Sequence, residues 1–214
     1  MNEKFFALPQ EKQNRILNAG YRVFSLNSYK KSPMSEIAEE AGISKSLLFH
    51  YFRNKKELYL YLWDKAIELG KEYIIASGCY ELEDFFDMMK MGAKAKVELM
   101  RQFPYIGVFA VRAYYEKDPE IMEEIQQSYH QVSRFSTAKA LKNVKPENFL
   151  PGLDLKSMCQ QMYWTSEGYM FEMIQSGNID VDRLERDAAE LVEFWRKIFG
   201  NGRKKENCEG GQSV

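Results

Sequence analysis

The sequence predicts an all-α protein, in which an N-terminal three-helix domain precedes a C-terminal helical bundle. Three observations support this prediction. Apolar residues recur at steps of three and four along most of the chain. No segment has the alternating pattern of a half-buried strand. Proline and glycine divide the chain into segments of helical length.

The first helix is expected over Gln10–Asn27, directly after Pro9. Its apolar residues fall on one face: Ile16, Ala19, Gly20, Val23 and Phe24. A polar connection follows. Ser32 then offers a capping hydroxyl, and Pro33 occupies the first helical position, which tolerates proline.

The second helix is short, and Met34, Ile37, Ala38 and Ala41 form its apolar stripe. Gly42 is expected to end it, because glycine accepts the left-handed backbone of a tight turn. Ser44 is expected to cap a third helix that ends near Tyr51. A long fourth helix begins at Lys55 or Lys56, runs to about Ile75 and is expected to join the two domains rigidly.

Five more helices are expected, over Leu82–Gln102, Pro104–Tyr115, Pro119–Asn143, Asp154–Ser176 and Asp180–Phe199. The predicted domains are residues 1–54 and residues 55–200. Residues 201–214 are polar and rich in glycine, so we expect a disordered tail there.

Charge is distributed unevenly along the chain, although the net charge of the 214 residues is only −1. Residues 1–61 hold ten basic and six acidic residues, a formal charge of +4 that leaves −5 for the rest. A basic N-terminal part on an acidic body suggests that this part meets a polyanion.

The sequence also indicates a compartment. The N-terminus lacks the basic run and apolar core of a signal peptide, and no apolar stretch is long enough to cross a membrane. The three cysteines, Cys79, Cys159 and Cys208, are widely spaced and odd in number, as expected for free thiols in a reducing compartment. We therefore expect a cytoplasmic protein with no membrane partner.

The stretch from Met34 to Phe52 has the pattern of a helix-turn-helix, with the motif at about residues 33–52. Two short helices joined by a glycine turn must pack closely, which explains Ala38 and Ala41. The second helix of such a pair lies in the major groove of double-stranded DNA. The predicted DNA-binding residues are Ser32, Ser44, Lys45, Ser46, Leu47, Phe49, His50, Tyr51 and Lys55.

Residues 10–70 resemble the DNA-binding domain of the tetracycline-repressor (TetR) family. The resemblance is carried by Ile-Ala-Glu-Glu-Ala-Gly-Ile-Ser-Lys and, downstream, Leu-Phe-His-Tyr-Phe-Arg-Asn-Lys-Lys-Glu-Leu. It implies a homodimer that binds a palindromic operator, usually as a repressor released by a small molecule. The chain departs from the family pattern at Pro33, where threonine is common, and at Phe49, where tyrosine is common. Ser46-Leu47 replaces a common Gly-Thr.

The last two predicted helices are expected to form the dimer interface. The helix over Asp180–Phe199 has a clean apolar stripe, and the helix before it is apolar around most of its circumference. A helix that is apolar on two sides needs two partners, and the second would be the twin subunit. The predicted interface residues are Met162, Tyr169, Leu191, Trp195 and Ile198.

Aromatic and methionine side chains are dense in the C-terminal part, as in a sensor of a small apolar or amphipathic effector. The predicted effector pocket comprises Phe109, Arg112, Tyr129, Tyr163, Glu167 and Met170.

The alternatives are a helical enzyme and a helical protein-interaction adaptor that does not bind DNA. The enzyme is disfavoured because no catalytic, metal-binding or phosphate-binding motif occurs, so neither catalytic residues nor metal nor cofactor are expected.

Overall fold

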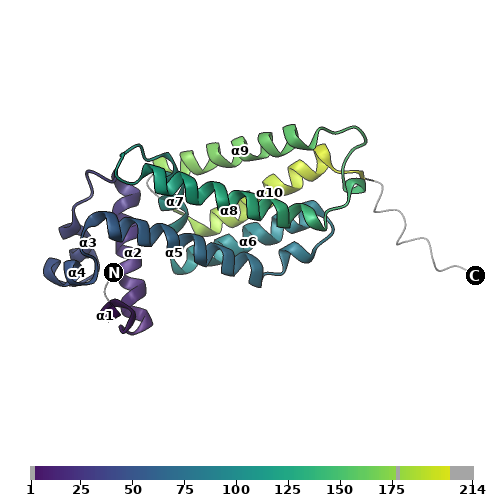
Figure 1. Ribbon diagram of the computed structural model, residues 1–214. Coiled ribbons are helices and arrows are strands. Elements are labelled where there is room, and N and C mark those ends of the chain that lie inside the picture. The colour runs from purple at the N-terminus through teal and green to yellow at the C-terminus, as the bar shows by residue number, and fades with distance from the viewer. Residues whose placement is uncertain (1–2, 177–178, 203–214) are drawn as a thin grey trace, which may run out of the picture. The chain divides into compact units, whose positions relative to one another are not determined.

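The computed structural model describes residues 3–176 and 179–202. Within these ranges the regular secondary structure is helical apart from one isolated bridge between Phe149 and Gly200 (Figure 1). The predicted all-α class is thus confirmed. The predicted tail falls almost wholly outside the described residues, as does Cys208. Cys79 is a buried and Cys159 an exposed free thiol. No described helix is both long and apolar enough to cross a membrane.

The helices lie close to the predicted ranges. The N-terminal ones are α1 (Glu3–Phe6), α2 (Gln10–Leu26), α3 (Met34–Glu40), α4 (Lys45–Tyr51) and α5 (Lys55–Ala76). The others are α6 (Phe85–Gln102), α7 (Ile106–Tyr115), α8 (Met122–Lys142), α9 (Leu155–Ser176) and α10 (Val181–Phe199). Two short 3-10 helices, Cys79–Glu81 and Pro146–Asn148, were not expected, and neither was α1.

The chain packs as two compact units. The first contains the residues up to Tyr73 together with Lys96–Ser136, and the second contains Ile74–Ala95 together with the residues from Thr137 onward. Helices α5, α6 and α8 each contribute residues to both units. The predicted functional boundary after residue 54 stays a prediction.

The core of the first unit is aromatic. Phe109 of α7 is fully buried, with ring centroids 5.2 Å from Tyr21 of α2 and 5.1 Å from Tyr59 of α5. Phe24 adds a contact at 4.7 Å to Tyr59. A Cβ on Gly20 would lie 2.6 Å from Leu62 Cδ1, so this glycine allows α2 to approach α5 closely. These contacts fix the helices against which α3 and α4 pack.

The second unit has its own core, built from α6, α9, α10 and the segment around Phe149. The Phe85 and Phe149 rings lie 5.3 Å apart, centroid to centroid. Met162 of α9 and Trp195 of α10 belong to this core and are 4% and 6% exposed. Both were predicted at the dimer interface, and their burial in their own unit does not support that prediction.

Gly42 ends α3 as predicted, at φ 65°. Nothing lies within 4 Å of a Cβ built on this residue, so an alanine there would suffer only from its backbone conformation. Gly42→Ala is expected to lower the free energy of unfolding by about 1–2 kcal/mol, measured by urea denaturation.

Gly70 supplies the matched control, because it lies within α5 and its added Cβ would also meet nothing. Gly70→Ala is expected to raise stability by roughly 0.5–1 kcal/mol through helix propensity. A Gly42→Ala variant as stable as Gly70→Ala would contradict the account of the turn.

Candidate nucleic-acid interface

The turn between α3 and α4 sets the direction of α4. The Gly42 N–H donates to the Glu39 carbonyl at 2.9 Å, and the Ile43 N–H donates to the Ala38 carbonyl at 2.9 Å. Ser44 then caps α4 as predicted, since its Oγ accepts from the Leu47 N–H at 3.1 Å. These backbone hydrogen bonds therefore hold α4 against α3, and the contacts between the buried side chains of the two helices add to this.

One face of α4 is buried and the other is open. Leu48 is fully buried and Tyr51 is 7% exposed, because residues three apart share a helix face. The exposed residues are Ser44, Lys45, Ser46, Leu47, Phe49 and His50. Six of the nine predicted residues therefore form one continuous exposed edge.

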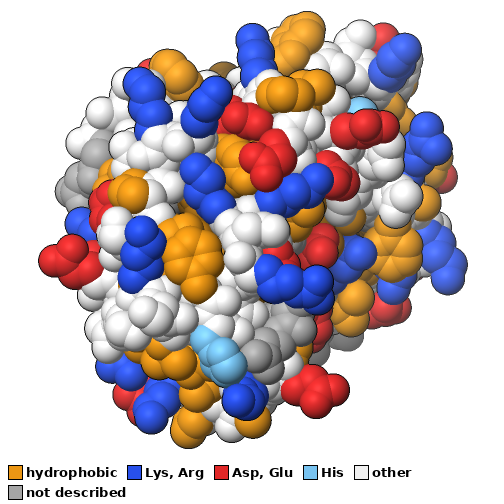
Figure 2. All heavy atoms as spheres, turned by 60° about the vertical axis from the view of Figure 1, so that its left-hand side comes forward, with side chains coloured by type: hydrophobic (Ala, Val, Ile, Leu, Met, Phe, Trp, Pro, Cys, Tyr) orange, Lys and Arg blue, Asp and Glu red, His pale blue; other side chains and the backbone are white. Residues whose placement is uncertain are grey.

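Lysine and aromatic side chains lie together along this edge. Lys45 Nζ is 5.9 Å from the centroid of the Phe49 ring, which lies one turn further along α4. Phe49 and Leu47 are 39% and 36% exposed. Figure 2 turns this side of the first unit forward and shows Lys, Arg and hydrophobic side chains over it, with Asp and Glu side chains among them. Such a surface offers cations to phosphates and apolar groups to base edges.

Two of the nine predicted DNA-binding residues are buried. Ser32 is fully buried, and its hydroxyl donates to the Ser28 carbonyl at 3.0 Å instead of capping α3 or facing solvent. Pro33 is the N-cap residue of α3, and no side chain caps it. Tyr51 packs inward, with its ring centroid 5.9 Å from that of Phe5. Burial of these two side chains does not support their predicted contact with DNA, which stays a prediction.

Lys55 is held at the base of the same surface. Its Nζ donates to the Lys30 carbonyl at 3.1 Å and lies 4.7 Å from the Tyr29 ring centroid. These contacts pin the loop between α2 and α3, where Lys30 and Lys31 are exposed. Lys55 remains partly exposed, so it still contributes positive charge beside α4.

Carboxylates of the segment that joins α7 to α8 form hydrogen bonds with the loop between α2 and α3. Glu116 Oε2 accepts from the Tyr29 N–H at 2.8 Å. Burial raises the pKa of the Tyr29 hydroxyl, and a hydrogen bond to Glu120 raises it further. Glu124 pairs with Lys56 at 2.7 Å, and this hydrogen bond lowers the pKa of the Glu124 carboxyl. Glu116 and Glu120 therefore brace the loop between α2 and α3, and the ion pair of Glu124 joins α8 to the start of α5.

The predicted effector residues divide between the two units. Phe109, Arg112 and Tyr129 lie in the first unit, whereas Tyr163, Glu167 and Met170 lie in the second. Phe109 is part of the aromatic core described above, which does not support its predicted role in a pocket. Arg112 Nε is buried and has no hydrogen-bond acceptor. The pocket itself stays a prediction.

The second unit exposes a set of large apolar side chains on its last two helices. Trp164 and Phe171 of α9 are 57% and 61% exposed, and Phe194 and Ile198 of α10 are 56% and 43% exposed. Of the predicted interface residues, Ile198 belongs to this set, Leu191 is partly buried, and the Tyr169 hydroxyl donates to Asp187 at 2.7 Å. Trp164, Phe171 and Phe194 were missed, although spacings of seven and four could have identified them.

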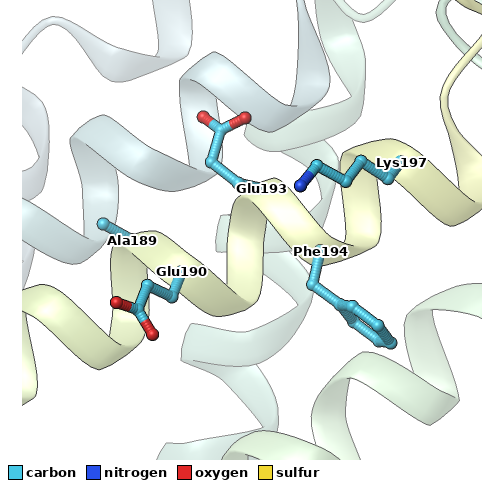
Figure 3. A pocket seen from close by; sticks show the side chains of 5 residues that line it. All are labelled: Ala189, Glu190, Glu193, Phe194 and Lys197. Carbon is cyan, nitrogen blue, oxygen red and sulfur yellow. The ribbon is translucent and has the colours of Figure 1, made fainter.

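A shallow hollow of about 320 Å³ adjoins Phe194 (Figure 3). Its lining comes from α10 alone and comprises Ala189, Glu190, Glu193, Phe194 and Lys197. In Figure 3, Phe194 projects away from the side of α10 that carries Glu193. Glu193 is paired with Lys90 of α6 at 3.1 Å, and Phe194 lies on a different side of α10.

Comparison with known proteins gives a match to the family described as bacterial regulatory proteins, tetR family, over residues 16–62. An HTH-type transcriptional activator, FasR of Mycolicibacterium smegmatis, is 35% identical over 68 residues, or 31% of each chain. The HTH-type transcriptional regulator RutR of Escherichia coli K12 is 27% identical over 116 residues, or 53% of each chain. The chain thus spans about a third to a half of the length of these relatives.

Similarity of fold extends further. The structure of SmeT, the repressor of the multidrug efflux pump SmeDEF of Stenotrophomonas maltophilia, matches with a TM-score of 0.61 at 15% identity. The match covers 92% of each chain. Together these comparisons confirm the predicted resemblance and the predicted fold, a helix-turn-helix followed by a helical C-terminal domain.

Proposed function

We propose that this chain, whose N-terminal helix-turn-helix is that of the tetR family of bacterial regulatory proteins, is a sequence-specific DNA-binding transcriptional regulator. The observation that carries the proposal is the exposed edge of α4 from Ser44 to His50. Within a helix-turn-helix of this kind, the second helix is the one that enters the major groove. We therefore call α4 the recognition helix.

The residues of the recognition helix divide by chemistry. Lys45 is suited to a phosphate or to the acceptor atoms of guanine, and His50 can donate to a base or phosphate. Leu47 and Phe49 are suited to apolar contact with thymine methyl groups. Lys30, Lys31 and Lys55 add charge at the edge, where phosphate contacts would hold the register.

The proposed active form is a homodimer joined through α9 and α10. Five large apolar side chains of these helices are exposed within one unit, including Trp164, Phe171 and Phe194, and a large exposed apolar area usually marks an interface. A two-fold dimer would present two recognition helices to half-sites of a palindrome about 34–36 Å apart. Such a regulator acts where the chromosome lies, which is consistent with the cytoplasmic location expected from the sequence.

A small apolar or amphipathic effector is proposed to release the protein from its operator, which makes the chain a repressor. Two contacts support this. Glu116, at the end of α7, accepts from Tyr29 in the loop before α3, and Glu124 of α8 pairs with Lys56 at the start of α5. A shift of α7 or α8 would therefore be transmitted to the helix-turn-helix and to the helix that follows it. Arg112 of α7 has a buried Nε that lacks an acceptor, and a carbonyl or carboxylate oxygen of an effector would supply one. Of the relatives named above, FasR is described as an activator and SmeT as a repressor.

Selection of genomic DNA fragments by the purified full chain tests the proposal. The wild type and a Lys94→Ala variant, whose lysine is exposed on α6, are expected to enrich one short palindrome. A Lys45→Ala/His50→Ala variant is expected to enrich none.

The contradicting result is an absence of enrichment by the wild type at moderate salt, both as purified and after refolding away any bound small molecule. That result would favour a helical adaptor or enzyme over a regulator, and the refolding step removes an effector as the cause.

A further inference from the structure

We infer that Phe5, in the short helix α1, is a positioning residue that fixes the C-terminal end of the recognition helix α4 and so contributes to operator specificity. The inference rests on the proposed DNA-binding function. Phe5 lies outside residues 16–62, the part of the chain that matches the tetR family, so the family match assigns it no role.

Phe5 is fully buried, although it lies in a helix of only four residues. Its ring centroid is 5.0 Å from that of Phe52, 5.9 Å from that of Tyr51 and 5.5 Å from that of Tyr61. All three ring pairs are tilted or edge-to-face, geometries that aromatic pairs prefer. Phe5 therefore bridges the last residue of α4, the residue that caps it and the side of α5.

The recognition helix needs such support because it has only seven residues. A helix of this length is not stable by itself and takes its position from tertiary contacts. Its N-terminal end is held by the Gly42 turn and by the Ser44 cap. At its C-terminal end the Phe52 N–H donates to the Leu48 carbonyl, and Phe5 covers the side chains of Tyr51 and Phe52.

The α1 helix is itself anchored to the start of α2. Gln13 Nε2 donates to the Leu8 carbonyl at 2.9 Å and to the Phe6 carbonyl at 3.3 Å. The Leu8 N–H also donates to the Phe5 carbonyl at 3.1 Å. Phe5 is thus held on a fixed backbone and is not carried by a loose arm.

The position of the last turn of α4 should affect the preference for the operator sequence more than the affinity for DNA in general. Phe49 and His50 lie on the exposed side of the turn whose inner side carries Tyr51. Base contacts depend on close geometry, whereas phosphate contacts mainly position the protein and carry no sequence information. Loss of Phe5 should therefore weaken operator binding more than non-specific binding.

The test compares Phe5→Ala with Phe6→Ala, because the neighbouring Phe6 is 52% exposed and serves as a matched control. Affinities for the selected operator and for a scrambled duplex are measured on the full chain, well below the melting temperature of each variant. The ratio of the two affinities is expected to fall about tenfold in Phe5→Ala, comparable to the effect of removing one base contact. It is expected to stay within about twofold of wild type in Phe6→Ala and in the rescuing variant Phe5→Leu.

An unchanged ratio in a folded Phe5→Ala protein, even one with a lower melting temperature, would overturn the inference and leave the proposed function intact. If Phe5→Ala does not fold, Phe5→Val is compared with Phe6→Ala in the same way. The ratio of affinities is then expected to fall by an intermediate factor, and an unchanged ratio would again overturn the inference. Failure of the wild type itself to bind any operator would overturn the proposed function, and the inference with it.

Discussion

Replacement of Phe109 by alanine is expected to lower the free energy of unfolding by about 3–5 kcal/mol. Phe109 is fully buried, and its ring contacts those of Tyr21, Phe24 and Tyr59, so its removal leaves a cavity between α2, α5 and α7. Because these rings support the helix-turn-helix, the melting temperature should fall by several degrees. Urea denaturation followed by circular dichroism measures the change.

Phe135→Ala is the matched control, since Phe135 of α8 is 45% exposed. Its replacement is expected to change stability by less than about 1 kcal/mol. A Phe109→Ala protein as stable as the Phe135→Ala protein, but with altered effector affinity, would restore the original prediction of Phe109 as a pocket residue.

Phe194→Asp is expected to convert the proposed dimer to a monomer at micromolar concentration, because the change places an unpaired carboxylate in the proposed interface. Phe194 is 56% exposed in the single chain and projects from a different side of α10 than Glu193 (Figure 3). A monomer engages one half-site at a time, so operator affinity should fall by about 10²–10⁴-fold. Sedimentation velocity and DNA binding measure the two effects.

Phe135→Asp controls for the introduction of a charge, because this exposed phenylalanine lies outside α9 and α10. It should leave both the dimer and operator affinity unchanged. A Phe194→Asp protein that still sediments as a dimer would contradict the proposed interface.

Most of the helix-turn-helix could be predicted from the sequence because its signals are local. The Ser44 cap and the Gly42 turn depend on residue types at fixed offsets, and both are present as predicted. Tyr51 was predicted among the DNA-binding residues, although the sequence also indicated that its side chain would be buried. It lies three residues after the buried Leu48 and therefore shares the inner face of α4.

Other features depend on packing that no local pattern specifies. The α1 helix is too short for helical periodicity, so the anchor at Phe5 could not be predicted from the spacing of apolar residues. The α9 helix is apolar on several sides, and only the fold shows that Met162 faces its own core while Trp164 and Phe171 face solvent. The fold class and the exposed edge of α4 were therefore predictable, whereas the choice of which apolar side chains of α9 and α10 are exposed was not.

The salt dependence of operator binding tests the central claim, that the exposed edge of α4 contacts DNA, most directly. Removal of a lysine that binds one phosphate should reduce the slope of log K against log salt by about 1. Lys45→Ala is expected to show that reduction, together with weaker binding, whereas the exposed Lys94 of α6 can be replaced by alanine without effect. A slope and an affinity identical in the wild type and in Lys45→Ala would contradict the placement of α4 on DNA.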